Sequence, residues 1–398
     1  MAAGDVKRAR DVEMIYDQIV IERIEVRAVG PDVDRYSWAS DLDQQYGTLT
    51  VVRMYDDQGF EGVGATPSYS TGRFDLAILE TLRHLAPRVL GADPLEREAV
   101  WYGLQDLALE VLMGAQSALD IALWHIVAQR AGVPLHQLLG GSRRRLPAYA
   151  STPLLADAGA YVAFVGELLE RGFRAVKFHA WCEADRDLEM LRKVHDAHGG
   201  TGIRMMHDAE QRYDRVSALR VARELDAMGF AWLEAPLPDQ DVEGYAELRR
   251  RTGVPIIAAG NTILDLQSVS TALRLHPWDA LRTDATVAGG ITPCRKLIAL
   301  AEGAGLWTEL QSWGYTLIQA ANLHFGLAHE HSGYFELPVP HEPYEYGVEN
   351  PYRIQPDGYV DAPTAPGLGV VVDWERMRAA RLSSFTCTSR NPEPSEEM

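Results

Sequence analysis

The feature that most constrains the fold of this chain is a series of seven polar residues that recur along its middle at intervals of about 23 to 29 residues. Each residue follows a short apolar run and precedes a stretch with helical periodicity. In order, they are His179, Asp208, Glu234, Asn261, Asp284, Gln311 and Glu336. One strand, one loop and one helix need about this length, and a (β/α)8 barrel carries its chemistry at the C-terminal ends of its strands. The series therefore predicts a single site at the mouth of a barrel.

Eight apolar segments between residues 143 and 340 support this prediction. They start with LPAYAST and end with GYFEL, and helical stretches separate them. The sequence has no Gly-rich dinucleotide loop, which disfavours a doubly wound sheet. The helix that would follow the eighth strand is missing. We therefore expect an α/β fold whose main domain is a modified TIM barrel of the (β/α)7β type.

The remaining segments predict a second domain and flexible residues at both ends of the chain. Residues 19–142 combine strand patterns, including a hairpin around Asp57-Gln58-Gly59, with three helical stretches, so we expect an α+β capping domain there. Residues 341–382, rich in Pro, Gly and Tyr, should leave the barrel (143–340) and return to this capping domain. We expect residues 1–18 to form a flexible arm and residues 383–398 a disordered tail.

Composition and charge exclude several classes of protein. The net charge of -18 disfavours binding to nucleic acid, which needs clustered Lys and Arg. No apolar run approaches the ~20 residues of a membrane span, and the first residues lack the apolar core of a secretory signal. The three unevenly spaced cysteines fit reduced thiols in the cytoplasm. An acidic protein that binds a carboxylate needs a local positive centre, for which a divalent cation held by Asp and Glu is the usual solution.

Several motifs resemble those of a known family. AVKFHA, MMHDAE and WLEAPLPDQD fall on strands two to four, and AAGN, TDATVAGGI, LQSWG and YFE follow on strands five to eight. In this order and spacing, residues 19–375 resemble the mandelate racemase-like group of the enolase superfamily (the mandelate racemase/muconate lactonizing enzyme family). Members of that group remove a proton α to a carboxylate and hold the enediolate on Mg²⁺. The resemblance implies a small carboxylate substrate, Mg²⁺ as the cofactor and a homo-oligomer.

The resemblance implies a set of metal ligands with one departure from the family. Asp208 and Glu234 match the first two ligands, but Asn261 stands where a third carboxylate is expected. Asn still offers an oxygen to Mg²⁺, although the lost charge should weaken binding. Glu210, two residues after Asp208 and on the same face of the strand, is a candidate replacement. Asn261 is an equally good candidate for the cap of the helix that follows it.

The proton-transfer groups of the family are also altered. The family carries Lys-x-Lys on strand two, where this chain has Lys177 and His179. His, with an ordinary pKa of ~6.5 against ~10.4 for Lys, is the easier base at neutral pH, and Lys177 is the alternative. On the opposite face, Asp284 matches the Asp of the family, but Gln311 replaces the His that pairs with it. Gln cannot carry a proton near pH 7, so racemisation by two bases is disfavoured.

Two further acidic residues and two loops have predicted roles. Glu336 matches the strand-eight carboxyl group of the family, which hydrogen-bonds the substrate carboxylate if it stays protonated. Glu309 is a candidate substitute for the missing His, with a structural role as the alternative. The loops at residues 32–47, which contain Trp38, and at residues 66–73 either close the barrel mouth or pack the interface between the domains.

These observations support three hypotheses of function. The first is a Mg²⁺-dependent dehydratase of a hydroxy or sugar acid, because enediolate formation needs only one base. The second is an epimerase or racemase whose other acid is Glu309 or a loop residue. The third is a barrel that has lost turnover and acts as a binding protein, which Asn261 and Gln311 favour.

Overall fold

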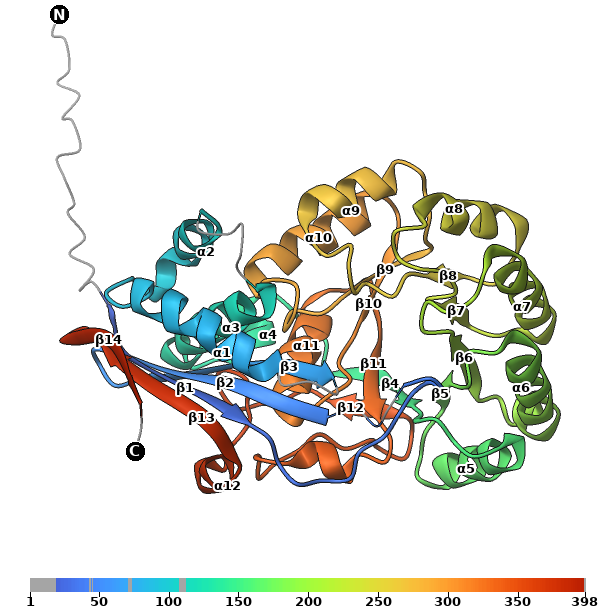
Figure 1. The fold of residues 1–398 in the computed structure, drawn as a ribbon, viewed down its shortest axis with the longest axis horizontal. Helices are drawn as coiled ribbons and strands as arrows, with labels where there is room; N and C mark the ends of the chain where they lie inside the picture. The colour runs from blue at the N-terminus through green and yellow to red at the C-terminus, as the bar shows by residue number, and fades with distance from the viewer. Residues whose placement is uncertain (1–18, 43, 45, 71–73, 107–111, 397–398) are drawn as a thin grey trace, which may run out of the picture.

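The computed structural model describes residues 19–396, apart from 43, 45, 71–73 and 107–111. The chain forms a barrel and, beside it, a smaller domain built on an antiparallel sheet (Figure 1). The predicted combination of a modified TIM barrel and a capping domain is therefore confirmed. The arm predicted for residues 1–18 lies outside the described residues.

The capping domain is a five-stranded antiparallel sheet packed against helices. In spatial order, its strands are β14 (Asn391–Glu396), β13 (Arg381–Thr388), β1 (Ile21–Val29), β2 (Tyr46–Asp56) and β3 (Glu61–Ser70). Its helices are α1 (Phe74–Leu85), α2 (Arg97–Gln105), α3 (Met113–Ala131) and α4 (Leu135–Leu138), with 3-10 turns at Ala86–Arg88 and Pro94–Glu96. The predicted hairpin joins β2 to β3, and its turn requires the positive φ of +86° at Gly59.

Helix α3 is the centre of the capping domain. Its residues from Ala115 to Ala128 are buried, as expected for a helix that is apolar on most sides. Strand β3 approaches α3 so closely that a Cβ atom on Gly62 or Gly64 would meet the α3 backbone. Glycine at these two positions therefore allows the sheet to pack directly on the helix.

The barrel consists of eight parallel strands, as predicted. Strands β4 to β11 follow one another around the sheet, and β11 pairs with β4 to close it. The strands are β4 (Arg145–Ser151), β5 (Ala175–His179), β6 (Arg204–Asp208), β7 (Trp232–Glu234), β8 (Ile256–Ile257), β9 (Ala280–Thr283), β10 (Trp307–Leu310) and β11 (Ser332–Pro338). The helices between them are α5 (Ala158–Glu170), α6 (Ala184–His198), α7 (Arg215–Met228), α8 (Val242–Arg251), α9 (Leu266–Leu273), α10 (Ile291–Gly303) and α11 (Thr316–Ala328), with a 3-10 turn at Gly199–Thr201 after α6. A 3-10 turn, Glu342–Glu345, follows β11 in place of an eighth helix.

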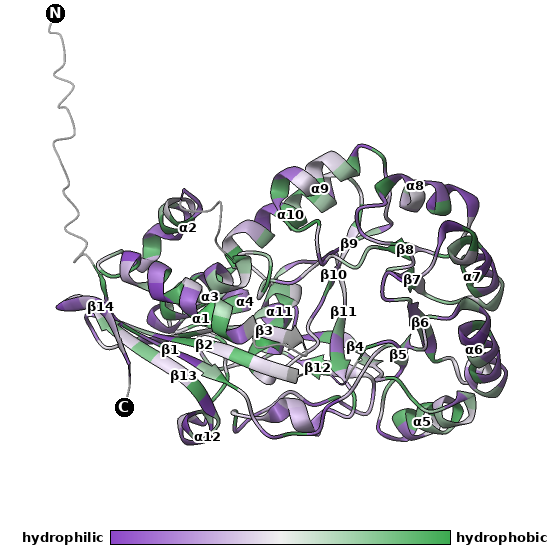
Figure 2. Ribbon diagram, in the orientation of Figure 1, coloured by the Kyte–Doolittle hydropathy of each residue, from purple (hydrophilic) through white to green (hydrophobic). Residues whose placement is uncertain are grey.

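Local sequence explains where several barrel helices begin. Asp157, Asp214, Asp241 and Asp265 each accept a hydrogen bond from a backbone N–H in the first turn of α5, α7, α8 and α9. The outer faces of α6 and α7 are strongly hydrophilic, which agrees with helices that surround a barrel (Figure 2). Among the described residues, none of the helices combines the length and apolar character needed to cross a membrane.

The segment after the barrel returns to the capping domain, and it does so by way of an extra strand. Strand β12 (Tyr359–Asp361) pairs antiparallel with β4, and α12 (Trp374–Ala379) follows before the chain reaches β13. Strand β13 then pairs with β1. The C-terminal segment is thus part of both the barrel and the capping sheet.

The prediction of a disordered tail from residue 383 is wrong, because residues 383–396 form the end of β13, a two-residue turn and β14. Phe385 and Cys387 alternate with polar neighbours and are buried against the sheet. Pro392 and Pro394 lie in β14, at the edge of the sheet, where a missing N–H donor costs little. The Pro- and Glu-rich composition had concealed this alternation.

Buried contacts join the capping domain to the barrel. Val51 and Val63 of the capping sheet share an apolar cluster with Leu317 and Ile318 of α11. Asp120 of α3 accepts hydrogen bonds from the backbone and the hydroxyl group of Thr292, at the start of α10. These contacts fix the sheet relative to the barrel and so position the loop that follows β1.

Candidate active site

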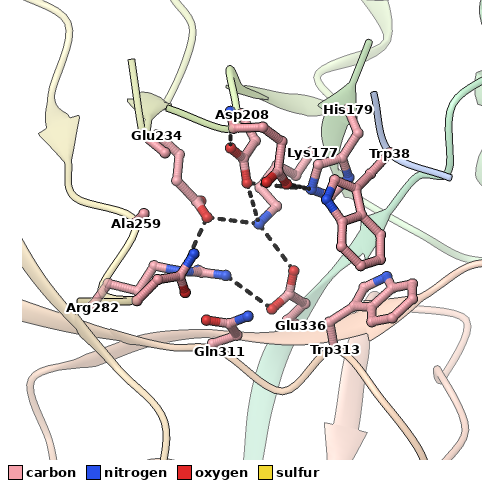
Figure 3. Close-up of a pocket in the computed structure, with 13 residues that line it drawn as sticks. Trp38, Lys177, His179, Asp208, Glu234, Ala259, Arg282, Gln311, Trp313 and Glu336 are labelled. Carbon is pink, nitrogen blue, oxygen red and sulfur yellow. Dashed lines mark hydrogen bonds and ion pairs between the residues drawn. The ribbon is translucent and has the colours of Figure 1, made fainter. Parts of the chain in front are cut away.

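A pocket of about 240 Å³ lies at the C-terminal ends of the barrel strands (Figure 3). Eight of the nine predicted site residues line it: Lys177, His179, Asp208, Glu210, Glu234, Asn261, Gln311 and Glu336. Its wall also includes Arg282 and Trp313, which the sequence prediction omitted, and Trp38 from a loop of the capping domain. The ninth predicted residue, Asp284, is not part of the wall.

Lys177 lies at the centre of the pocket floor, with 1% of its side chain exposed. Its Nζ is 3.2 Å from Asp208 Oδ2, 2.8 Å from Glu234 Oε1 and 3.0 Å from Glu336 Oε1. Burial and the nearby Arg282 would lower the pKa of Lys177, but Glu234 and Glu336 outweigh them and hold this pKa well above its usual range. Lys177 is therefore a fixed cation, which differs from its expected alternative role as a base.

His179 ends β5, and Thr152 orients its ring. Nδ1 is 2.6 Å from the carbonyl oxygen of Thr152, and because a carbonyl oxygen only accepts, this nitrogen carries a proton. Nε2 faces the pocket, 3.3 Å from Asp208 Oδ2 and 3.1 Å from Glu210 Oε1. Burial alone would lower the pKa of His179, but these two carboxylates outweigh burial and raise it to about 10. The expected neutral base is thus an imidazolium for as long as both carboxylates hold it.

Glu210 reaches the pocket by a different route from the predicted one. Strand β6 ends at Asp208, and Glu210 follows it in the left-handed region, at φ +50°, instead of continuing one face of the strand. Its backbone N–H donates to Asp208 Oδ1 at 2.9 Å, which supports this unfavourable conformation. The ligand atoms of His179, Asp208 and Glu210 lie within 4.8 Å of one another.

Asn261 belongs to the pocket wall and does not cap a helix. Helix α9 begins at Leu266, and Asp265 accepts the capping hydrogen bonds. The backbone N–H of Asn261 donates to Asp239 Oδ2 at 2.9 Å. The alternative prediction of a helix cap is therefore wrong, and the amide group of Asn261 is available to the pocket.

Arg282 is the charged pocket residue that sequence reasoning missed. It lies in β9 with 3% of its side chain exposed, and its Nε is 3.0 Å from Glu234 Oε1. Its Nη2 is 3.2 Å from Glu336 Oε2. The available signal was an arginine two residues before Asp284, at an inward position of an otherwise apolar strand.

Glu336 is ionised, which differs from its expected role as a protonated donor. Burial alone would raise the pKa of Glu336, but Lys177 and Arg282 outweigh burial and lower it to about 2. The backbone N–H of Ser312 also donates to Glu336 Oε2, at 3.1 Å. Glu336 therefore anchors the cations of the pocket floor and has no proton to donate to a substrate carboxylate.

Asp284 points away from the pocket, which departs from its expected catalytic position. Strand β9 ends at Thr283, so the alternation of inward and outward side chains does not extend to Asp284. Its Oδ1 accepts from the backbone and hydroxyl groups of Thr286 and from Asn322 Nδ2. Burial raises the pKa of Asp284 to about 6. These contacts give it a structural role in joining the end of β9 to α11.

Glu309 also lies outside the pocket wall. Its Oε1 accepts from Trp307 Nε1 at 3.1 Å, and a Cβ atom on Gly333 would collide with its carboxyl group. Burial raises the pKa of Glu309 to about 8. These contacts favour the structural alternative for Glu309 over the role of second acid.

The wall on the β10 side is uncharged and aromatic. Gln311 and Trp313 follow the end of β10, and Trp313 packs edge-on against Trp38 with ring centroids 5.1 Å apart. The loop that carries Trp38 is tied to the barrel, because the carbonyl oxygen of Ser37 accepts from the backbone N–H of Leu154 at 2.7 Å. Of the two alternatives for this loop, these contacts favour the one in which it reaches the barrel mouth. Residues 71–73 of the other loop lie outside the described residues.

The oxygen atoms that line the pocket are of the types that bind Mg²⁺ in proteins. Asp208, Glu210 and Glu234 offer carboxylate oxygens and Asn261 offers an amide oxygen to one pocket, and Mg²⁺ prefers such ligands. Glu234 is the most heavily engaged of them. Its Oε1 faces two buried cations, and its Oε2 accepts from Trp232 Nε1 at 3.1 Å.

Comparison with known families covers most of the chain. Residues 24–140 match the N-terminal domain of mandelate racemase / muconate lactonizing enzyme, and residues 160–376 match the enolase C-terminal domain-like family. The boundary between these two matches falls where the capping domain gives way to the barrel.

Individual relatives agree with these matches. A D-galactonate dehydratase family member from Streptomyces bingchenggensis is 31% identical over 382 residues, which cover 82% of this chain and 88% of the relative. A mandelate racemase/muconate lactonizing enzyme-like crystal structure from Pseudovibrio sp. has a TM-score of 0.90 and 37% identity, and covers 93% of this chain and 99% of that chain. L-Talarate/galactarate dehydratase from Salmonella typhimurium, liganded with Mg and L-lyxarohydroxamate, shares the fold with a TM-score of 0.86 and 23% identity over 98% of this chain and 100% of that chain. By sequence and by fold, this chain belongs to the mandelate racemase/muconate lactonizing enzyme family of the enolase superfamily.

Proposed function

We propose that this protein removes water from a sugar acid with the help of Mg²⁺. In this reaction the C–H bond α to the carboxylate and the C–O bond to the β-hydroxyl group break, and a C=C bond forms between the two carbons. The proton and the hydroxyl group leave as water, and the enol becomes a 2-keto-3-deoxy acid. Relatives that act as sugar-acid dehydratases support this class of substrate.

The observation that carries the proposal is the asymmetry of the pocket wall. The ionisable side chains come from β5 to β7, the floor and the β6 loop, whereas Gln311 and Trp313 form the β10 side. Among the described residues that line the pocket, none on the β10 side can exchange a proton near pH 7. Inversion of the α-carbon needs proton transfer on both faces of the substrate, but dehydration needs a base on one face only.

His179 is the base in this proposal. The carbonyl group of Thr152 holds Nδ1–H, so the neutral ring presents its basic nitrogen, Nε2, to the pocket. The imidazole of His179 then gives this proton to the β-hydroxyl group, which leaves as water on the face of the substrate that His179 contacts. Asp208 and Glu210 favour the protonated ring, and a cation held by their oxygens would weaken this preference.

Asp208, Glu234 and Glu210 are the proposed Mg²⁺ ligands, with the amide oxygen of Asn261 as a further one. When bound, the ion supplies positive charge that stabilises the enediolate. Lys177 supplies a second, permanent charge at the pocket floor and binds the substrate carboxylate. Trp38 and Trp313 offer flat apolar faces to the C–H groups of the sugar chain. The assembly into a homo-oligomer stays a prediction.

A screen of acid sugars tests this function. The protein is incubated with Mg²⁺ in deuterated buffer with a library of mono- and diacid sugars, and a sample treated with a chelator is the control. Formation of a keto acid that the chelator abolishes supports the proposal. Deuterium at the α-carbon without loss of water supports an epimerase instead, and no reaction across the library supports a binding protein.

A further inference from the structure

Arg282 has an unusual position for a permanently charged side chain. It is buried inside the barrel and borders the pocket beside Glu234, one of the residues that the proposed function assigns to the metal (Figure 3). Its guanidinium group bridges two carboxylates, with Nε at 3.0 Å from Glu234 Oε1 and Nη2 at 3.2 Å from Glu336 Oε2. A planar guanidinium group can hold two acceptors at once, and it stays protonated at every pH at which the protein is folded.

Glu234 is consequently a ligand that another cation already holds. The oxygen that faces Arg282 also lies 2.8 Å from Lys177 Nζ, and the other oxygen accepts from the indole N–H of Trp232. A divalent ion that binds Glu234 competes with these donors for the lone pairs of its two oxygens. It must also approach a guanidinium group that repels it.

The charges of the pocket floor are already largely balanced. Lys177 and Arg282 contribute two positive charges beside the carboxylates of Asp208, Glu234 and Glu336. Asn261 adds no charge at the position where the family pattern places a carboxylate. Both features reduce the attraction of the pocket for a divalent ion.

We propose that Arg282 is a built-in competitor of the divalent ion, and that it holds Glu234 when the metal site is empty and keeps metal affinity low. This inference rests on the metal site of the proposed function. Loss of the guanidinium group should therefore increase the affinity for a divalent ion, whereas loss of an ordinary pocket residue should decrease it.

Titration with Mn²⁺, followed by electron paramagnetic resonance of the free ion, tests this proposal without any substrate. We expect the Kd of Arg282→Gln to be at least about 10-fold lower than that of the parent protein. Arg145→Gln is the matched control, because it removes the same charge from an exposed ion pair with Asp357 at the opposite end of the barrel. Its Kd should equal that of the parent protein.

Arg282→Lys provides a second measurement that does not depend on the folding of Arg282→Gln. Its ammonium group keeps the charge but cannot bridge Glu234 and Glu336, so we expect a Kd between those of the parent protein and Arg282→Gln. The proposal is overturned if the folded Arg282 variants bind Mn²⁺ with a Kd equal to or higher than that of the parent protein. It is also overturned if neither the parent protein nor the variants bind Mn²⁺. If the variants bind Mn²⁺ more tightly while no acid sugar reacts, the proposal stands and the proposed dehydratase function falls.

Discussion

The two sides of the pocket are built from the same kind of barrel strand, yet they differ sharply in chemistry. The side formed by β5, β6 and β7 crowds Lys177, His179, Asp208 and Glu234 into direct contact. The β10 side presents an amide and an indole, at Gln311 and Trp313. The same strand architecture therefore carries a charged half and, among the described residues of the β10 side, a half without a group that transfers a proton near pH 7.

The largest effect should come from the charged side. Replacement of His179 by Gln removes the proposed base but keeps the size and polarity of the side chain. We expect kcat to fall by about 10³-fold, because general-base catalysis typically contributes ~10²–10⁴-fold. His331→Gln is the control, since His331 is exposed and lies away from the pocket. A loss of less than about 10-fold in His179→Gln would remove His179 from the mechanism.

The next largest effect should come from the aromatic β10 side of the pocket. Trp313→Ala removes one half of the Trp38–Trp313 contact and widens the pocket. We expect KM to rise by about 10-fold with a smaller change in kcat, because the indole binds substrate in the ground state and the transition state alike. Trp374→Ala, in α12 of the C-terminal segment, is the control. A fall in kcat at constant KM would mean that Trp313 acts in the chemical step instead.

A variant of Asp284 tests whether this buried acid acts in stability or in catalysis. Asp284→Ala removes the carboxylate oxygen that accepts at 2.7 Å both from the amide of Asn322 and from the hydroxyl group of Thr286. We expect the free energy of unfolding to fall by about 1–3 kcal/mol, the usual cost of unpaired buried polar groups, while kcat/KM changes by less than about 3-fold. Urea unfolding and steady-state kinetics measure the two quantities. A large loss of activity in a stably folded variant would return Asp284 to the active site.

The last effect appears only as a pH dependence of stability and concerns the buried acid Glu309, outside the pocket wall. Burial raises the pKa of Glu309 to about 8, above its value of ~4.3 in an unfolded chain. The protonated group therefore stabilises the native state fully below about pH 4.3, and this contribution is lost as the pH rises through about 8.

Glu309→Gln removes this titration and keeps an oxygen for Trp307. Between about pH 5 and pH 8, the unfolding free energy of the parent protein should fall by about 1–3 kcal/mol more than that of the variant, as urea unfolding can measure. Parallel profiles would mean that Glu309 titrates normally.

Much of this comparison could be read from the sequence. The regular alternation of strands and helices located the strand ends, and His179, Asp208 and Glu234 fall at those ends in the structure. Alternation of inward and outward side chains does not hold where a strand ends one residue before the expected position. Because β9 ends at Thr283, Asp284 turns toward α11 and the inward residue is Arg282.

Other features depend on contacts that no local pattern contains. The protonation states of His179 and Glu336 are set by charged groups from other strands, so their ordinary pKa values were misleading. Glu210 reaches the pocket only because the chain adopts a left-handed turn after β6. The ordered tail was missed for a different reason, since the alternation of Phe385 and Cys387 is short and is followed by two prolines.

The most direct test of the one-sided pocket is the stereochemistry of the reaction. An active acid sugar is incubated with the protein and Mg²⁺ in deuterated water, and both the product and the recovered substrate are analysed by nuclear magnetic resonance. We expect a 2-keto-3-deoxy acid as the only product, with no epimer of the substrate. Accumulation of the α-epimer carrying deuterium would contradict the one-sided pocket, because it requires a second proton donor on the β10 side.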